Sequence, residues 1–446
     1  MNAIVLAVVV MVALSLLRVS VVFALIVAAV VGGLAAGLPM ERIVAAFNDG
    51  LGGGASVALA YAALGAFAVA LSRTGIAQRL SARVVEHVSH SHHAGGELAL
   101  VKWGMLGALI VAGALAETLI PVHIAFIPIL VPPLLHVMNR LKLDRRLVAC
   151  AITFAITTLY MVLPVGFGAI FLNDILIANI NQSGAAQGFS VTRDLAPQAM
   201  LLPALGMVAG LAIAAFSYRR KRAYQDVAVA GEHLGHADTK LSRRQVGMIG
   251  LSLLLALVVQ LWTDSMVFGG LVGFAVISLS GVIRWREQDH VVTQGMHLMA
   301  QVGFIMIAAA GFAAVMKATG AIPELVSGSV ELIGDNRGLA ALIMLLVGLF
   351  ITMGIGSSFS TVPIITAIYV PLALGFGFSP LAIIALVGTA AALGDAGSPA
   401  SDSTLGPTAG LNADGQHDHI WDTVVPTFLH FNLPLIAFGW VAAMVL

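Results

Sequence analysis

The sequence predicts an all-α polytopic membrane protein built from two inverted-topology repeats, each with about five spans, one re-entrant hairpin and one broken helix. Three observations support this fold class. Of the 446 residues, 59% are hydrophobic and only 10% are charged, whereas soluble domains carry about 25% charged residues. The apolar segments are continuous, unlike the alternating ten-residue strands of a membrane β-barrel. The sequence also resembles itself at an offset of 245 residues.

The internal repeat keeps a constant offset over two predicted spans and the loops between them. At this offset, the matching positions are Ser20–Phe23 with Ser265–Phe268, Gly50 with Gly295, Phe67 with Phe312, and Thr74-Gly75 with Thr319-Gly320. Further along the chain the register drifts, but proline and glycine recur at similar places. The chain therefore divides into repeat 1 (1–216), a polar linker (217–244) and repeat 2 (245–446).

Each repeat contains the same order of elements. Three spans are predicted first, at 3–17, 20–38 and 55–72, and again at 246–262, 266–283 and 298–316. A helix–break–helix unit follows (98–138 and 339–376), then an interrupted span (146–180 and 380–410) and a closing span (195–216 and 422–445). If the helix–break–helix unit is a re-entrant hairpin, each half crosses the membrane five times. An odd number of crossings inverts the second half relative to the first.

The distribution of basic residues gives a separate prediction of topology. With the N-terminus outside and the linker inside, eighteen of the 22 Lys and Arg residues lie in inside loops. Cytoplasmic loops are enriched in Lys and Arg, so this favours the inverted arrangement. We expect a bacterial inner-membrane protein with both termini periplasmic and the linker 217–244 cytoplasmic. The four basic residues expected outside are Arg42, Arg193, Lys317 and Arg337.

The helix–break–helix units carry polar residues at corresponding places. The first runs from Glu117 and Thr118 through Pro121 to His123, and the second runs from Gly354 to Pro363. Backbone can leave a helix at membrane depth only inside protein or beside a wet cavity, so paired breaks indicate a transport site. The alternative is a pair of ordinary kinks in which Ser and Thr bond back to their own helix. The candidate residues of the second break are Ser357, Ser358, Ser360 and Thr361.

The strongest motif interrupts the apolar span near residue 400. The segment from Gly394 to Pro407 contains two carboxylates, Asp395 and Asp402, and the hydroxyl residues Ser398 and Ser401 among others. Oxygen ligands of this kind suit a hard cation such as sodium, and an intramembrane carboxylate can instead carry a proton. The alternative is a loop outside the membrane with solvated aspartates. The candidate sodium ligands are Asp395, Ser360 and Thr361.

Other polar residues give weaker indications. Glu117 is a single carboxylate after an apolar run, with His123 as a candidate partner. Near the C-terminus, His430 and Asn432 lie in or beside the last span. We expect the acidic and histidine residues between the last two predicted elements to be solvated. These are Asp414, His417, Asp418, His419 and Asp422.

Several function classes lack their usual motifs. No Gly-Lys-Ser/Thr phosphate loop occurs, which argues against an ATP-driven pump. No His-Glu-x-x-His pair occurs, and the symmetric breaks disfavour an intramembrane enzyme. A non-catalytic sensor or scaffold is disfavoured because buried carboxylates are costly to keep without a transport role. The basic residues flank predicted spans and form no separate basic face, so we expect no nucleic-acid partner. We expect membrane lipid and a small ion or solute as partners, and no cofactor.

The run Phe47–Gly52, the Ser357-to-Pro363 break and the Gly394-to-Pro407 break resemble the Na+/H+ antiporter family of the NhaC type. They are most similar to a branch of uncertain substrate within the ion transporter superfamily. The resemblance covers essentially the whole chain. It implies a homodimer in which transport elements (98–180 and 339–410) move against a scaffold formed by the remaining spans, in an elevator-like displacement. The Ser-Asn-Thr signature of the superfamily's carboxylate symporters is missing here, since Glu117-Thr118 and Ser360-Thr361 stand in its place.

The leading hypothesis is therefore sodium/proton exchange, with Asp395 and Asp402 alternately binding sodium and protons, assisted by Ser357, Ser360, Thr361 and Ser398. The alternative is a sodium- or proton-coupled symporter of a small organic solute such as an amino acid or a carboxylate. In that case, the N-terminal ends of the interrupted helices would hold the solute carboxylate, and Glu117 would pair with an amino group.

Overall fold

In the computed structural model, every regular element of the described residues is a helix, which confirms the all-α fold class. The described residues are 2–17, 19–74, 97–118, 127, 131–225, 242–263, 265–321, 324, 327, 328, 331, 333, 334, 336–355, 357–399 and 401–446.

The helices of the first half include two long ones, α3 and α11. The elements up to the linker are α1 (Ala3–Leu16), α2 (Val21–Ala35), α3 (Met40–Ser72), α5 (Glu97–Thr118), η1 (Pro132–Leu134), α7 (Leu135–Arg140), α8 (Arg145–Tyr160), α9 (Phe167–Ala169), η2 (Ile170–Ile177), α10 (Ala178–Gly184), η3 (Ala185–Gln187) and α11 (Leu195–Ser217).

The helices of the second half end in a nearly continuous helical stretch that reaches Val445. The elements after the linker are α12 (Arg243–Thr263), α13 (Met266–Leu279), η5 (Trp285–Glu287), α14 (Gln288–Ala318), α16 (Arg337–Ile355), α17 (Ser358–Gly375), α18 (Pro380–Ala392), α19 (Asp402–Leu411), η6 (His419–Val424), α20 (Val425–Thr427), η7 (Phe428–Asn432) and α21 (Leu433–Val445).

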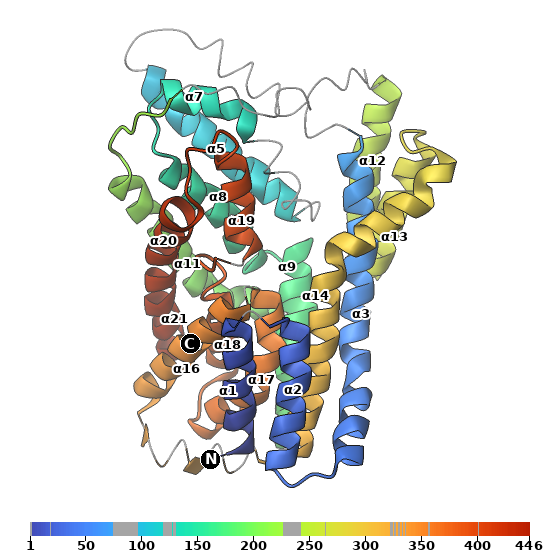
Figure 1. Cartoon of the computed structure of the whole chain (residues 1–446), viewed down its shortest axis with the longest axis vertical. Coiled ribbons are helices and arrows are strands. Elements are labelled where there is room, and N and C mark those ends of the chain that lie inside the picture. The colour runs from blue at the N-terminus through green and yellow to red at the C-terminus, as the bar shows by residue number, and fades with distance from the viewer. Residues whose placement is uncertain are drawn as a thin grey trace.

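The helices form two groups that lie side by side (Figure 1). In one group, α14 packs along α3, α2 packs against both of these helices, α13 packs against α3, and α12 packs against α13. In the other group, α18 contacts α11, α16, α17 and α21, while α8 contacts α5, α11 and α19. The contact between α14 and α17 joins the groups. Both groups combine helices from the two halves of the chain, so neither half folds as a separate unit.

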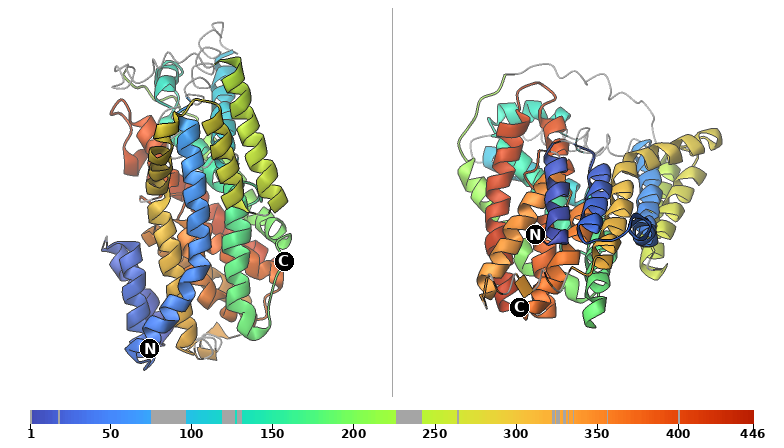
Figure 2. Two further views of the ribbon diagram at one scale, coloured as in Figure 1. Left: turned by 90° about the vertical axis from the view of Figure 1, so that its right-hand side faces the viewer. Right: turned by 60° about the horizontal axis from the view of Figure 1, so that its bottom comes forward.

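The α3–α14 pair is antiparallel and depends on small residues (Figure 2). A Cβ atom added to Gly50 would lie 2.6 Å from the carbonyl oxygen of Ala310, and one added to Gly295 would lie 2.2 Å from the backbone nitrogen of Ala66. These distances are shorter than van der Waals contact, so the close approach of the two helices requires glycine at both positions.

Both helices are longer than the spans predicted for them. α3 begins at Met40 rather than near residue 55, and α14 begins at Gln288 rather than near residue 298. The added turns contain charged and polar residues such as Glu41, Asp49 and Asp289. Because such turns can remain helical outside an apolar layer, hydropathy marks the apolar part of a helix and not its ends.

Three helical stretches in the described part of the chain are long and apolar enough to cross a membrane, and seven shorter helices are also apolar. The three long stretches are Leu195–Ser217, Arg243–Gln260 and His419–Val445. On α11, large apolar side chains such as Leu201, Val208 and Phe216 are exposed on one face. A long apolar helix with such a face is suited to contact with lipid.

Two helices are interrupted inside the second group. α8 ends at Tyr160 and the chain becomes helical again at Phe167, while α18 ends at Ala392 and α19 begins at Asp402. Both interruptions lie where proline and glycine interrupt the predicted spans. α16 ends at Ile355 and α17 begins at Ser358. The ends of α8, α17 and α18 meet at the site described next.

Candidate functional site

Asp395 is a buried carboxylate in the non-helical segment between α18 and α19. Only 8% of the residue is exposed. Its Oδ2 accepts hydrogen bonds from the Tyr160 hydroxyl at 2.7 Å and from Ser358 Oγ at 3.0 Å. Its Oδ1 accepts a hydrogen bond from Ser401 Oγ at 2.5 Å. Three hydroxyl groups therefore surround a buried carboxylate.

Three separate elements supply these hydroxyls. Tyr160 is the last residue of α8, Ser358 is the first residue of α17, and Ser401 caps α19 by accepting a hydrogen bond from the backbone N–H of Ser403. The N-terminal end of α17 therefore faces Asp395, and the partial positive charge of a helix N-terminus favours an anionic group there. The two hydroxyls on Oδ2 are also 2.9 Å apart.

The backbone of the segment between α18 and α19 is held by side chains. The amide of Asn432 accepts a hydrogen bond from the N–H of Gly394 at 2.7 Å and donates one to the carbonyl of Ala396 at 2.7 Å. Ser403 Oγ donates to the carbonyl of Asp395 itself at 2.7 Å. These bonds replace those that a continuous helix would have made, as a buried backbone requires.

Two glycines permit the backbone path. Gly394 has φ of +84° and Gly397 has φ of +114°, a region that L side chains rarely adopt. A Cβ atom on Gly397 would also lie 2.5 Å from the Cα of Phe428. The turn that presents Asp395 therefore requires glycine on both sides of the carboxylate.

An aromatic cluster (Tyr160, Phe167, Phe171 and Phe359) lies beside the carboxylate. The Phe359 ring centroid is 5.2 Å from that of Tyr160, 5.6 Å from Phe167 and 5.4 Å from Phe171. Such edge-on arrangements are favourable for aromatic pairs. The cluster joins the start of α17 to both sides of the interruption after α8.

The structure brings together some of the predicted residues and separates others. Asp395, Ser358 and Ser401 are in direct contact, whereas Asp402 is exposed in the first turn of α19. Ser357 caps α17 with its backbone, since its carbonyl accepts from the N–H and the hydroxyl of buried Thr361. Ser398 donates to the carbonyl of Met353. The side chains of Thr118 and Ser360, and the whole of His123, lie outside the described part.

Glu117 is buried near the end of α5, with 2% of the residue exposed. One helical turn earlier, Gly113 packs so closely on α8 that an added Cβ would lie 2.9 Å from the Cβ of Ala155. Residues four apart share one face of a helix, so Glu117 lies on the face of α5 that packs against α8. α5 also contacts α9, which follows the interruption after Tyr160.

A second polar cluster lies where the loops after α7 and α19 meet. The guanidinium of Arg145, fully buried, donates to both carboxylate oxygens of Asp414 at 2.6 and 2.5 Å, and to the carbonyl of Leu411 at 2.9 Å. The expectation that Asp414 is solvated is therefore wrong, because the distant residue Arg145 covers it. Burial raises the pKa of Asp414, but the hydrogen bonds from Arg145 outweigh it and the pKa is lowered.

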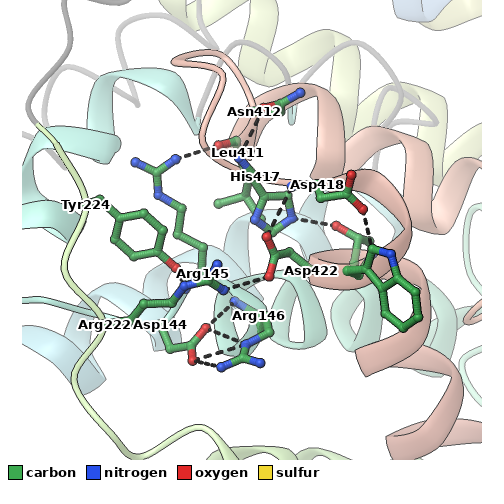
Figure 3. Close-up of polar contacts among 12 residues, drawn as sticks. Asp144, Arg145, Arg146, Arg222, Tyr224, Leu411, Asn412, His417, Asp418 and Asp422 are labelled. Carbon is green, nitrogen blue, oxygen red and sulfur yellow. Dashed lines mark hydrogen bonds and ion pairs between the residues drawn. The ribbon is translucent and has the colours of Figure 1, made fainter.

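The residues Arg219–Gln225, here called the strap, hold these two loops together (Figure 3). Arg222 pairs with Asp422 at 2.6 Å, and its N–H donates to the carbonyl of Lys142 at 3.0 Å. The Tyr224 ring lies 4.3 Å from the Arg145 guanidinium. Asp422 and His417 are also buried, at 8% and 2% exposure, so the expectation of solvated side chains is wrong for both.

The sequence did not indicate Tyr160 as a site residue, and it indicated Asn432 only weakly. A tyrosine at the end of an apolar run, just before the Pro164–Gly166 interruption, could have indicated Tyr160. The role of Asn432 had no local signal, because its two partners precede it by 38 and 36 residues.

Comparison with known proteins gives consistent results. The profile of the Na+/H+ antiporter family matches residues 151–440, and a second profile described as the Na+-H+ antiporter family matches residues 2–88. The chain is 57% identical to the "Uncharacterized membrane protein VP2115" of Vibrio parahaemolyticus, over the full length of both proteins. It is 47% identical to the "Putative amino acid transporter YuiF" of Bacillus subtilis, again over the full length of both.

Two solved structures share the fold. Neisseria gonorrhoeae MtrF, described among antimetabolite efflux pumps, aligns with a TM-score of 0.61 and 15% identity, covering 91% of this chain and 85% of that one. The Alcanivorax borkumensis YdaH transporter aligns with a TM-score of 0.61 and 15% identity, covering 91% and 88%. Together with the apolar helices, these matches identify a multi-pass membrane protein.

Proposed function

The chain belongs to the Na+/H+ antiporter family, and from this premise we propose that it exchanges sodium for protons at Asp395. One observation carries the proposal: a buried carboxylate accepts hydrogen bonds from three hydroxyls at the meeting point of two interrupted helices and the start of α17. A sodium/proton exchanger needs a group that can bind a sodium ion or a proton but not both at the same time.

The chemistry of the site supports this competition. An ionised Asp395 offers carboxylate oxygens, and each hydroxyl around it can turn its proton away and present a lone pair. Carboxylate and hydroxyl oxygens are ligands that a hard cation such as sodium prefers. When Asp395 takes a proton instead, its negative charge is lost and with it most of the attraction for sodium. Occupation by one ion therefore excludes the other, which couples the two fluxes.

The proposed movement is alternating access by an elevator-like displacement of the interrupted helices. Many transporters with alternating access are built from two inverted repeats, and the α3–α14 contact supports such repeats here. Gly50 meets Ala310, while Gly295 meets Gly65 and Ala66. At the offset of 245 residues, Gly50 corresponds to Gly295 and Gly65 corresponds to Ala310. A reciprocal contact of this kind is expected of two equivalent helices related by a two-fold axis.

The second candidate function is sodium- or proton-coupled transport of an amino acid, and the name of the Bacillus subtilis relative favours it. In that mechanism, the N-terminal end of α17 would bind the carboxylate of the solute and Asp395 would bind its amino group. The two candidates differ in whether a sodium pulse alone moves protons.

The experiment measures proton movement with a pH-sensitive dye in liposomes that contain the purified protein. We expect a sodium pulse to release protons without added solute, and we expect Asp395→Asn to reduce the signal to that of protein-free liposomes. Asp194→Asn is the matched control, because Asp194 is an exposed carboxylate at the start of α11. Proton movement that appears only after an amino acid is added would favour the second candidate instead.

A further inference from the structure

The exposed face of α11 is apolar up to the end of the helix and is followed directly by basic residues. Four large apolar side chains of this face are 46% to 66% exposed. Their spacing along the helix places them on one side of it. We call them the apolar stripe (Leu201, Leu205, Val208 and Phe216). After the helix, the chain continues with four consecutive basic residues, Arg219, Arg220, Lys221 and Arg222.

The side chain of Arg219 returns to the end of the apolar stripe. Its guanidinium carbon lies 4.4 Å from the centroid of the Phe216 ring. Such a cation–π contact is attractive, and it holds the charge over the last residue of the stripe. The aliphatic part of an arginine can cover apolar surface while its charged end reaches polar groups. The end of α11 therefore combines an exposed apolar surface with a positive charge directly beside it.

Three of the basic residues are exposed and lie between two anchored residues. We call them the basic patch (Arg219, Arg220 and Lys221). Before the patch, the Tyr218 ring lies 4.6 Å from the Arg146 guanidinium. After the patch, Arg222 pairs with Asp422 at 2.6 Å, and its N–H donates to the carbonyl of Lys142. Because the backbone on both sides is held, less conformational freedom is lost when the patch binds an anion.

The aspartates close to the basic patch already have other partners. Three of them lie in this region, and each forms an ion pair with an arginine outside the patch. The pairs are Asp144–Arg146, Asp414–Arg145 and Asp422–Arg222. In the part of the chain that the structure describes, no carboxylate forms an ion pair with the basic patch. The patch is therefore suited to an anion from outside the protein.

The last helical stretch of the chain places an exposed tryptophan at the same end of α11. The two run antiparallel, because Gly206 approaches Phe438 while Gly210, one turn later, approaches His430. The start of the last stretch therefore lies beside the end of α11. Trp421, near this start, is 71% exposed. Tryptophan is enriched where a membrane meets water, so this end of the two helices has the composition of a headgroup region.

We propose that the end of α11 binds an anionic phospholipid, with the acyl chains on the apolar stripe and the phosphate on the basic patch. A lipid such as phosphatidylglycerol has an apolar part next to a single negative charge, which matches the order of the two surfaces. A run of basic residues directly after a membrane helix is typical of binding to anionic lipids. The inference does not depend on sodium/proton exchange. Since Arg222 ties the strap to Asp422, a bound lipid also stabilises the strap.

The competing explanation is that the basic residues only orient the helix in the membrane and otherwise face water. Basic residues at helix ends have this role in many membrane proteins. Solvated side chains need neither the contact of Arg219 with the Phe216 ring nor an anchored backbone. They would also bind no lipid in preference to another, and this difference can be measured.

The test compares two lipids with identical acyl chains, anionic phosphatidylglycerol and zwitterionic phosphatidylcholine. Each is titrated into the purified full chain in detergent, and native mass spectrometry reports the bound lipid and the mass of the protein. The variant combines Arg219→Gln, Arg220→Gln and Lys221→Gln. Each basic residue strengthens binding to an anionic lipid by about fivefold. We therefore expect the dissociation constant of phosphatidylglycerol to rise by about a hundredfold, and that of phosphatidylcholine to stay within about twofold.

The matched control combines Arg42→Gln, Arg284→Gln and Arg286→Gln, which removes the same charge from exposed positions in the other helix group. An equal loss of phosphatidylglycerol affinity in both variants would show that total charge attracts the lipid, and it would overturn the site. A patch variant that keeps its lipid affinity but loses a bound second copy would also overturn it, since that copy would then cover the face. If the patch variant does not fold, Arg220→Gln with Lys221→Gln leaves Arg219 in place and should raise the dissociation constant by about twentyfold.

Discussion

At the scale of single residues, Asp395 combines burial with a full set of donors. A buried carboxylate is costly unless hydrogen bonds satisfy it, and here three hydroxyls do so at 2.5 to 3.0 Å. Tyr160 is the one that comes from the first half of the chain, 235 residues before Asp395. Its hydroxyl donates to Asp395 and lies 2.9 Å from the hydroxyl of Ser358, so it brings the end of α8 next to the two other elements of the site.

Replacing Tyr160 by phenylalanine should therefore weaken sodium binding without unfolding the protein. The loss of one hydroxyl from a charged partner costs about 1.5 kcal/mol or more, which corresponds to a rise of about tenfold in the KM for sodium. Tyr369→Phe is the control, because Tyr369 is equally buried but donates to the backbone carbonyl of Met344. A sodium titration of proton release in the two variants makes the comparison, and equal KM values would exclude Tyr160 from the site.

At the scale of secondary structure, the segment between α18 and α19 shows how a helix can stop inside an apolar environment. Its backbone groups have no helical partners, and side chains from elsewhere take their place. Asn432 binds the N–H of Gly394 and the carbonyl of Ala396, and Thr404 donates to the carbonyl of Ser398. The position of Asp395 therefore depends on η7, the element that contains Asn432.

Asn432→Leu should consequently impair transport more than it impairs folding. It leaves a buried N–H and a buried carbonyl unsatisfied, at about 1–3 kcal/mol each, and it frees the segment that orients Asp395. We expect the KM for sodium to rise by about tenfold or more, corresponding to the lower end of that cost.

Asn181→Leu is the matched control for this prediction. The Asn181 amide makes the same pair of bonds, to the N–H and the carbonyl of Val191, away from Asp395. Thermal unfolding in detergent and sodium titrations are measured for both variants. If both lose stability and both keep a wild-type KM, the amide of Asn432 has no role in positioning Asp395.

At the scale of the whole molecule, long-range contacts join the two halves. Arg145 and Asp414 are 269 residues apart in sequence and form a pair whose side chains are 0% and 1% exposed. The strap binds both loops of this region before the chain continues toward α12. The first residue of α8 is thereby connected to the end of α19, so the two interrupted helical stretches are linked at this point.

Asp414→Asn should strongly destabilise the protein, since it leaves the buried charge of Arg145 without its counter-ion. Removing one partner of a buried pair costs about 3–5 kcal/mol. Glu287→Gln breaks the exposed pair with Arg73, where a loss below about 1 kcal/mol is expected. Thermal unfolding of both variants at neutral pH provides the measurement.

The loss of stability expected for Asp414→Asn depends on pH. Because the pKa of Asp414 is lowered by Arg145, its stabilising effect is complete above the ordinary carboxyl pKa of about 4 and is lost as the pH falls further. The difference in stability between the wild type and Asp414→Asn should therefore be constant near neutral pH and shrink only in strong acid. A difference that disappears already at pH 6 would contradict the assignment of the pair.

By itself, the sequence determined the all-helical class, the membrane environment and the places where α8 and the α18–α19 stretch are interrupted, because hydropathy, proline and glycine act within a few residues. Its motifs also indicated the family. Only the tertiary structure decided which polar residues meet. It buried Asp395 and exposed Asp402, although both lie in one motif. It also brought Tyr160 to the Asp395 carboxylate and Asn432 to the backbone beside it. It also buried His417, Asp422 and the side chain of Asp414, which the sequence had suggested to be solvated. Burial depends on neighbours far away in the chain, and a local pattern contains no information about them.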